Sequence, residues 1–267
     1  MIWTLKIAMV LAGLYAAIVV AAYFLQTQLI FPAGLVGQGG GAPPNSSNVE
    51  LKTPDGETVV LVRMSPIAGE AGERPILLGF GGNAWSANAL AAMLHQMFPE
   101  YEIAAMHYRG YGPSSGRPSA RALFEDAALA YDHLSGQAGV VAVGLSIGAS
   151  VAVDLAANRP LKGLVLVTPF DSLKELAATH YPWLPVRLFL RHRMENAATL
   201  RDLKLPVAII TAEHDIVVPD ARSKPVREAS ADLRADIVID GAGHNDIYER
   251  AEFEASLRKS VAAVSAD

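Results

Sequence analysis

The chain has 267 residues and a formal net charge of −5; 18% of its residues are charged and 51% are hydrophobic. This balance excludes a disordered chain and a coiled coil. The mild acidity argues against nucleic acid, whose binding proteins usually carry a basic face. The chain has no cysteine, which excludes disulfides, thiolate metal sites and a cysteine nucleophile.

The N-terminal segment is almost free of charge. Lys6 is the only charged residue before Glu50, and Ile7–Leu25 contains no charged residue, Asn, Gln, Ser or Pro. A helix of that length spans about 28 Å, close to the ~30 Å hydrocarbon core of a bilayer. We therefore predict a membrane anchor over residues 1–27, with a cleaved signal peptide as the alternative.

The basic residues around this span predict its orientation. No Lys or Arg follows Lys6 until Lys52, so the positive-inside rule keeps the N-terminus in the cytoplasm and places the rest on the non-cytoplasmic side. Cleavage of a signal would instead give a secreted protein. Residues 28–49 include the Gly-, Pro- and Ser-rich stretch Gln38–Asn48, which indicates a flexible linker.

Residues 50–267 alternate short apolar runs with helical patterns, without an internal repeat, which predicts one domain. The strand-like runs are rich in β-branched residues: 59–64, 76–80, 103–107, 140–143, 164–167, 207–211 and 237–239. The helical patterns cover 87–97, 120–134 with Ser119 as its N-cap, 149–157, 220–231 and 246–264. This order predicts an α/β domain with a mostly parallel sheet and helices on both faces, whose ligands bind beyond the carboxyl ends of the strands.

The pattern G-x-S-x-G occurs twice, around Ser114 and around Ser146. A nucleophile elbow has to leave a buried strand, turn sharply and open a helix. Ser146 has the strand pattern Val140–Val143 before it and a small-residue helix pattern after it, whereas loop sequences flank Ser114 on both sides. We predict Ser146 as the nucleophile and Ser114 as a loop residue.

A serine nucleophile needs a histidine base and a carboxylate that orients it, and in this type of fold they follow in the order Ser, acid, His. His244 lies in the Gly-rich loop after the last strand pattern and is the predicted base. His95, His107 and His133 precede Ser146 and fail this order. His180 and His192 lie in an irregular, aromatic-rich region, and no strand end that bears an acid precedes His214.

The predicted acid is Asp215, just after the strand pattern 207–211. Glu213 is the second candidate and Asp171 a weaker one. Asp220 and Asp246 are predicted to cap the helices that follow them. The two oxyanion donors are expected to be the backbone N–H groups of Ile147, directly after the nucleophile, and of Asn83, in the Gly-Gly-Asn-Ala loop after strand 76–80.

Taken together, these residues resemble the α/β-hydrolase superfamily, and specifically its Bem46-like branch of membrane-anchored serine hydrolases. The matching motifs span nearly the whole chain: TQLIFP after the apolar span, GGNA, YRGYGPSSGRPS from Tyr108 to Ser119, GLSIGA, HDIVVP and GAGHND. The resemblance implies the α/β-hydrolase fold, the triad Ser146, Asp215 and His244, and the donors Asn83 and Ile147. In one departure, Gly81 replaces the His of the usual His-Gly-Asn loop, which bears on the rigidity of that loop.

The resemblance also implies hydrolysis of a carboxylic ester or thioester through an acyl-enzyme on Ser146, with no metal or organic cofactor. Similar proteins include protein depalmitoylases, generic esterases and lysophospholipase-like enzymes, so the expected substrate is a small-molecule or lipid-like acyl compound. A serine peptidase of the same fold and a catalytically silent, membrane-anchored binding module are the alternatives.

Residues 170–204 form the one sizeable insertion and are predicted to be a small lid. Its apolar residues are expected to face either the core or an acyl pocket: Trp183, Leu184, Leu188 and Phe189. Its basic residues are expected to face solvent or anionic lipid headgroups: Arg187, Arg191, His192 and Arg193.

Overall fold

The computed structural model describes residues 1–36, 41–67, 74–134 and 139–266. Its central element is an eight-stranded sheet with the strand order β1-β2-β4-β3-β5-β6-β7-β8. The strands are β1 Ser46–Lys52, β2 Thr58–Met64, β3 Ile76–Phe80, β4 Ile103–Met106, β5 Val140–Leu145, β6 Gly163–Val167, β7 Pro206–Ala212 and β8 Asp232–Ile239.

Strands β1 and β2 are antiparallel to their neighbours, and the six strands β3 to β8 are parallel. Every residue of β3, β4, β5 and β6 is buried. Continuous apolar runs of this kind fit parallel strands that are covered on both faces. The predicted mostly parallel sheet is therefore confirmed, and the carboxyl ends of its parallel strands lie along one edge.

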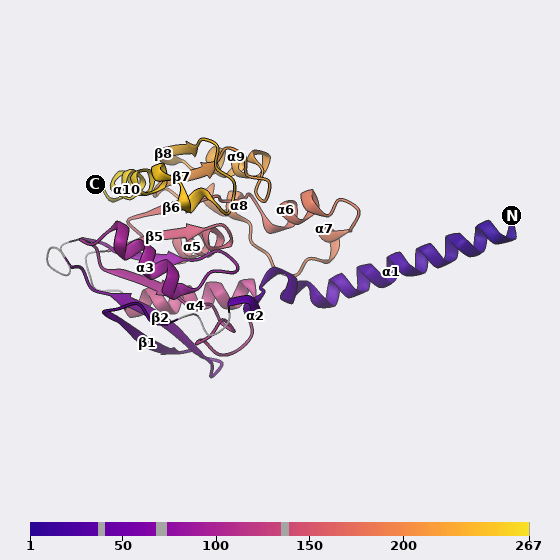
Figure 1. Ribbon diagram of the computed structural model, residues 1–267, viewed down its shortest axis with the longest axis horizontal. Coiled ribbons are helices and arrows are strands. Elements are labelled where there is room, and N and C mark those ends of the chain that lie inside the picture. Colours follow the sequence, from indigo (N-terminus) through magenta and orange to yellow (C-terminus); the bar gives the residue numbers. More distant parts are fainter. Residues whose placement is uncertain (37–40, 68–73, 135–138, 267) are drawn as a thin grey trace.

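Helices cover both faces of the sheet (Figure 1). Apolar residues of α3 and α10 belong to the core on one face, and those of α4, α5, α8 and α9 to the core on the other. The helices of the domain are α3 Ala87–Met97, α4 Ala120–Leu134, α5 Ile147–Asn158, α6 Leu173–His180, α7 Val186–Phe189, α8 Asn196–Leu200, α9 Asp220–Ala229, the 3₁₀ helix η1 Ile247–Glu249 and α10 Ala251–Ser265. Ser119 caps α4 as predicted, since its hydroxyl accepts from the Ala122 N–H at 3.1 Å.

Three local expectations differ from the structure. Strand β1 begins at Ser46, inside the range predicted to be linker, and pairs with β2 along the sheet edge; residues 37–40 of that linker lie outside the described residues. Strand β8 begins at Asp232, five residues before the predicted run. The predicted helix over 246–264 is two elements, because the chain becomes extended at Arg250 between η1 and α10.

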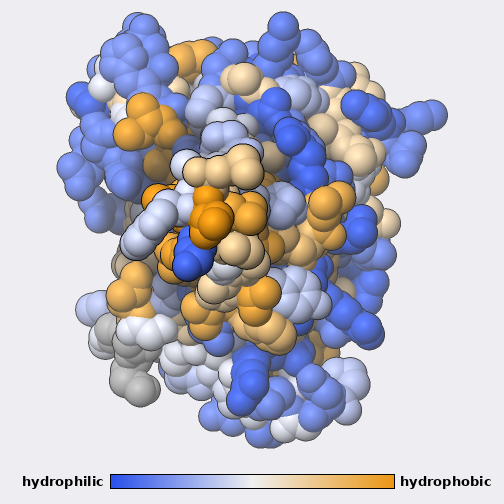
Figure 2. Space-filling model, turned by 90° about the vertical axis from the view of Figure 1, so that its right-hand side faces the viewer, coloured by the Kyte–Doolittle hydropathy of each residue, from blue (hydrophilic) through white to orange (hydrophobic). Residues whose placement is uncertain are grey.

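The N-terminal helix α1, Ile2–Ile30, projects away from the domain and is followed by the short α2, Ala33–Val36 (Figure 1). It is long and apolar enough to cross a membrane, since an 18-residue stretch within Ile2–Val36 has a mean hydropathy of 2.3. Figure 2 looks at the face from which α1 projects: apolar surface gathers around its centre and hydrophilic surface lies toward its edges.

Candidate active site

Ser146 occupies a strained turn between β5 and α5. Its backbone has φ 54° and ψ −114°, which side-chain-bearing residues rarely adopt. The flanking glycines make the turn possible: a Cβ on Gly144 would lie 2.5 Å from the carbonyl oxygen of Gly148, and one on Gly148 would overlap the Phe80 carbonyl. The predicted strand–turn–helix context of Ser146 is therefore present.

Three side chains from separate loops meet at this turn. His244 Nε2 lies 3.1 Å from Ser146 Oγ, and His244 Nδ1 lies 2.7 Å from Asp215 Oδ2. The other carboxylate oxygen of Asp215 accepts from the N–H groups of Val217 at 2.9 Å and Val218 at 2.7 Å. Asp215 is only 4% exposed and thus held in one orientation. In this arrangement the imidazole can take the hydroxyl proton while the carboxylate fixes its tautomer.

The alternative acids are engaged elsewhere. Glu213 Oε2 accepts from the Gly241 N–H at 2.8 Å, and Asp171 Oδ2 pairs with Arg222 Nη1 at 3.1 Å. Burial raises the pKa of the Asp171 carboxyl, and the Ser172 N–H and Arg222 partly offset that effect. Of the described carboxylates, Asp215 is the one hydrogen-bonded to the His244 ring.

The two predicted helix caps have different outcomes: Asp246 is the N-cap residue of η1 and its backbone carbonyl accepts from the Glu249 N–H at 3.1 Å, whereas Asp220 does not cap α9. Asp220 is the first residue of α9, and its carboxylate pairs with Arg227 at 2.5 Å instead of accepting from the helix N–H groups. Asp246 Oδ1 accepts from the Gly243 N–H at 2.7 Å, and its other oxygen pairs with Arg250. These two contacts lower the pKa of the Asp246 carboxyl, the Gly243 N–H contributing more. Asp246 therefore supports the loop that carries His244, because a carboxylate contact closes the turn around that residue.

The two predicted oxyanion residues line the same cavity as Ser146. Asn83 follows β3 and Ile147 opens α5. The cavity has a volume of about 490 Å³ and mostly apolar walls; its lining residues are Ile30, Gly82, Asn83, Ala84, Trp85, Ser146, Ile147, Phe170, Leu173, Leu176, Val217, His244, Asn245 and Tyr248.

Two tyrosines that sequence reasoning did not assign to the site hold the Gly-Gly-Asn-Ala loop. The Tyr108 hydroxyl donates to the Gly81 carbonyl and the Tyr111 hydroxyl to the Asn83 carbonyl, each at 2.7 Å. Burial raises the pKa of both phenols, so they remain protonated donors. The Tyr-x-x-Tyr spacing in YRGYG was the available signal.

The glycine at position 81 has a local steric explanation. A Cβ there would lie 3.0 Å from Trp85 Cβ, closer than ordinary contacts allow, so Trp85 occupies the space of a side chain. The Trp85 ring in turn packs edge-on against Tyr248, with 4.7 Å between ring centroids. The phenol contacts and this packing supply the loop with supports that do not depend on a histidine at position 81.

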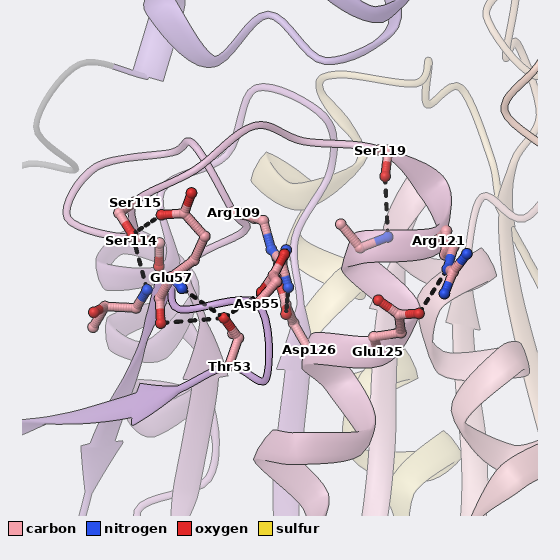
Figure 3. Close-up of polar contacts among 12 residues, drawn as sticks. Thr53, Asp55, Glu57, Arg109, Ser114, Ser115, Ser119, Arg121, Glu125 and Asp126 are labelled. Atoms are coloured by element: carbon pink, nitrogen blue, oxygen red, sulfur yellow. Dashed lines mark hydrogen bonds and ion pairs between the residues drawn. The ribbon is translucent and has the colours of Figure 1, made fainter.

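The second G-x-S-x-G segment is part of a structural network, as predicted for a loop (Figure 3). Ser114 Oγ accepts from the Val60 N–H at 2.9 Å and donates to the His107 carbonyl at 2.8 Å. Arg109, in the same loop, is buried and lies between Asp126 and Asp55, at 2.5 Å from each (Figure 3). A larger cavity of about 770 Å³ adjoins this ion-pair network, and Ser146 and His244 are not among its lining residues.

The lid differs from its predicted arrangement. Trp183 is 53% exposed and Leu188 88% exposed, so these side chains face neither the core nor the cavity. The cavity walls from this region are instead Phe170, Leu173 and Leu176. The predicted basic cluster is also divided, because His192 is buried against α1 while Arg187 pairs with Glu175 at 2.7 Å.

Within the described ranges, no group of three or more His, Asp or Glu side chains is arranged to hold a metal ion. The contacts described above place the Ser146 hydroxyl beside the His244 imidazole, which the buried Asp215 carboxylate contacts in turn.

Comparison with known proteins gives related sequences and folds. Rv2307c of Mycobacterium tuberculosis, which has no assigned function, is 34% identical over 252 residues, covering 91% of this chain and 88% of the relative. Protein bem46 of Schizosaccharomyces pombe is 29% identical over 184 residues, 64% of this chain and 61% of that protein. An α/β-hydrolase domain-containing protein of Arabidopsis thaliana, WAV2, is 28% identical over 172 residues, 56% of each chain. No family model matches the chain.

The solved structures that resemble this one share its fold at low sequence identity. A Pyrococcus furiosus esterase superposes with a TM-score of 0.67 at 15% identity, covering 85% of this chain and 95% of the esterase. A thioesterase domain from the curacin biosynthetic pathway superposes with a TM-score of 0.62 at 14% identity, covering 81% of this chain and 99% of the domain. The sheet, the elbow and the related sequences agree, and the chain belongs to the Bem46-like branch of the α/β-hydrolase superfamily.

Proposed function

We propose that the protein is a serine hydrolase that cleaves carboxylic ester or thioester bonds of acyl substrates and is held at a membrane by α1. The observation that carries the proposal is the chain of contacts from Asp215 through His244 to Ser146 Oγ inside an apolar cavity. Burial of the Asp215 carboxylate and its two backbone hydrogen bonds support its role as the group that orients the imidazole.

In the proposed reaction, Ser146 Oγ attacks the acyl carbonyl carbon while His244 Nε2 takes the hydroxyl proton. The carbonyl oxygen becomes an oxyanion, which the N–H groups of Asn83 and Ile147 stabilise. The intermediate then expels the alcohol or thiol, which receives the proton from His244, and leaves an acyl group on Ser146. Water, deprotonated by the same imidazole, releases the carboxylic acid and restores the serine.

The lining of the cavity favours an acyl ester over a peptide with a free amino terminus. Among the described residues that line it there is no Asp, Glu, Lys or Arg, and its aliphatic and aromatic walls suit a hydrocarbon chain. An α-amino group would need a carboxylate partner at that wall to offset its desolvation.

The test is labelling with a fluorophosphonate probe followed by peptide mass spectrometry. We expect modification of Ser146 in the wild-type protein and none in Ser146→Ala, while the matched variant Ser114→Ala is labelled like the wild type. Turnover of short-chain p-nitrophenyl esters together with weak turnover of aminoacyl amides would support the ester assignment. The reverse preference would identify a peptidase, and a native protein without labelling would identify a silent binding module.

The proposed anchor places the N-terminus in the cytoplasm and the hydrolase domain on the other side of the membrane. Helix α1 supports it by its length and hydropathy and by projecting from the domain (Figure 1). The intact mass of the membrane-extracted protein tests the proposal, since loss of about 22 residues would indicate a cleaved signal peptide instead.

A further inference from the structure

The lid contacts α1 between Tyr15 and Thr27. His192 Nε2 lies 2.9 Å from Thr27 Oγ1, and the Arg191 N–H donates to Gln26 Oε1 at 2.8 Å. Farther along, the Tyr15 hydroxyl donates to the Trp183 carbonyl at 2.8 Å. As the lid chain runs back from His192 to Trp183, its contacts thus advance along α1 from Thr27 to Tyr15, a distance of about 18 Å at 1.5 Å per residue.

This contact at Tyr15 limits where a bilayer can lie. The part of α1 before Tyr15, Ile2–Leu14, is about 20 Å long and is shorter than the ~30 Å hydrocarbon core. If α1 spans the membrane, about 10 Å of the core must surround the helix beyond Tyr15, on the side occupied by the lid. A tilted helix needs more residues to cross the same hydrocarbon core, so a tilt of α1 would place the lid deeper in the membrane.

The part of the lid at this depth is apolar. We call Tyr181–Leu190 the lid tip. Tyr181 is 51% exposed, Trp183 53% and Leu188 88%. Arg187 is the one charged residue of the tip and pairs with Glu175. In water these apolar side chains remain exposed to solvent, which is unfavourable. Transfer of each side chain from water into the hydrocarbon of a bilayer would be favourable.

The backbone of the lid tip is also suited to an apolar medium. The N–H groups of Leu184, Val186 and Leu188 donate to carbonyls of the same segment, and Pro182 and Pro185 have no N–H group. The Trp183 carbonyl is satisfied by Tyr15. These backbone groups are therefore already paired when the tip leaves water, and the charge of Arg187 is paired with Glu175.

Charged groups lie near both ends of the segment that would be embedded. At one end the Arg191 guanidinium lies over the Tyr23 ring, 4.9 Å from its centroid, at a level suited to lipid phosphates. At the other end, Lys6 Nζ lies 6.0 Å from the centroid of the Trp3 ring, directed toward the helix N-terminus as a snorkelling lysine is. Thr4 to Ala22 lie between the Trp3 and Tyr23 rings and span about 28 Å.

The cavity adjoins the same surface. Ile30, at the end of α1, and Leu173 and Leu176, on the lid helix α6, form part of its wall. The Asn83 side chain also donates to the Ile30 carbonyl at 3.3 Å, so the end of α1 touches the loop beside Ser146. A chain that enters between α1 and the lid would reach Ser146 from the membrane side.

We propose that the lid tip inserts into the hydrocarbon of the lipid leaflet that faces the domain, and that the active site takes its acyl substrate directly from that leaflet. The proposal rests on the proposed membrane span of α1 and names the lipid bilayer as the partner of the exposed tip. Lateral entry beside Ile30 then restricts natural substrates to acyl compounds that reside in the membrane.

The absence of cysteine allows single-cysteine labelling of the full chain in phosphatidylcholine vesicles. Leu188→Cys reports on the tip, Leu14→Cys on the middle of α1, and Ile67→Cys is the matched control, since Ile67 is 74% exposed and follows β2 near Pro99, at the edge of the sheet opposite the site. Each variant carries an environment-sensitive fluorophore, and lipids spin-labelled on their acyl chains serve as quenchers.

We expect blue-shifted emission and quenching for the probes at positions 188 and 14, and neither effect at position 67. Quenching at position 14 without quenching at position 188 overturns the inserted tip and leaves the proposed membrane span intact. Absence of quenching at position 14 overturns both. The fluorescence does not depend on turnover, so failure of the proposed hydrolase activity is detected separately by the fluorophosphonate label.

Activity provides a second test. Leu188→Asp places a charge where the tip would meet hydrocarbon, so turnover of a long-chain acyl ester embedded in vesicles should fall roughly tenfold or more. Turnover of a soluble short-chain ester should be unchanged, and Ile67→Asp should alter neither rate. Equal rates of the wild type and Leu188→Asp on the embedded ester would overturn delivery from the membrane.

Discussion

The chain contains the same five-residue pattern twice, and its two copies differ in almost every physical respect. Ser146 lies between a buried strand and a helix with positive φ, and its hydroxyl points to an imidazole. Ser114 lies in a loop, and its hydroxyl accepts a hydrogen bond from the Val60 N–H and donates one to the His107 carbonyl. A reactive serine needs a hydroxyl left available to a base, and the surrounding backbone determines whether it is available.

The most direct test of this difference between Ser146 and Ser114 is to remove each hydroxyl in turn. If Ser146, His244 and Asp215 form the proposed triad, Ser146→Ala should lower kcat for a short-chain p-nitrophenyl ester by about 10⁶-fold, because the members of such a triad act as a unit. Stability should change little, since among the described residues His244 is the one hydrogen-bond partner of Ser146 Oγ. Turnover within tenfold of the wild type would overturn the assignment of the nucleophile.

The carboxylate should be the next largest contributor. Asp215→Asn keeps the shape of the side chain but disfavours the tautomer of His244 that accepts the serine proton, and we expect kcat to fall about 10⁴-fold. Glu213→Gln is the matched control, since Glu213 contacts Gly241 and not the imidazole. Equal losses in the two variants would contradict the role given to Asp215.

The loop that carries Ser114 should make the fold sensitive to acid through His107. Burial lowers the pKa of His107 to about 4, against 6.5 in an unfolded chain. Between these pH values the unfolded state binds a proton that the native state does not. The free energy of unfolding should therefore fall as the pH drops, by about 1.4 kcal/mol per pH unit for this group.

Denaturant titrations at pH 7, 6 and 5 on the wild type and His107→Gln would measure this contribution. The variant should show a shallower loss of stability between pH 6.5 and 4. Parallel pH curves for the two proteins would show that the acid sensitivity arises from other groups.

Ser114→Ala should affect folding and not catalysis. The substitution leaves the Val60 N–H and the His107 carbonyl without a partner in a buried place, which should lower the free energy of unfolding by about 1–3 kcal/mol. Urea denaturation measures the loss, and kcat should stay within about threefold of the wild type. Loss of turnover at full stability would mean that the two serines are not as different as the structure indicates.

The smallest expected effect concerns the hydrogen bond from Tyr111, in the loop that carries Ser114, to the Gly-Gly-Asn-Ala loop beside Ser146. Tyr111→Phe removes the hydrogen bond to the Asn83 carbonyl, which should loosen the Gly-Gly-Asn-Ala loop that carries the proposed oxyanion donor. We expect kcat to fall roughly tenfold with little change in KM, because the donor acts on the transition state. Tyr131→Phe, whose hydroxyl binds the distant Pro160 carbonyl, is the control and should keep full activity.

Local sequence patterns predicted the elements that depend on local chemistry. The β-branched runs marked β3, β5, β6 and β7 because parallel strands buried on both faces need continuous apolar residues. Ser119 was recognised as a helix cap for a similar reason, since capping involves residues only three apart. The sharp turn at Ser146 followed from glycines and small residues next to it.

Features that depend on distant partners were missed. Strand β1 is held to β2 mainly through its backbone, and most of its side chains are exposed, so Ser46-Ser47-Asn48 looks like linker sequence.

The contacts between α1 and the lid join residues about 165 positions apart, which no periodic pattern reveals. Thr27 meets His192 and Tyr15 meets Trp183 only because the chain folds back on its own N-terminal helix. The sequence predicted an anchor and a lid as separate segments, and their common surface became visible only in three dimensions.

The close approach of α5 to β3 also matters for how this protein can be redesigned. At Gly148 the helix lies so near the Phe80 carbonyl that a single methyl group would not fit, so the floor beneath the serine tolerates almost no mutation. The walls above it come from Leu173, Leu176 and Val217, on segments that are not in that tight contact. A directed-evolution library confined to those wall positions should change which substrates are accepted while leaving the chemistry itself unaltered.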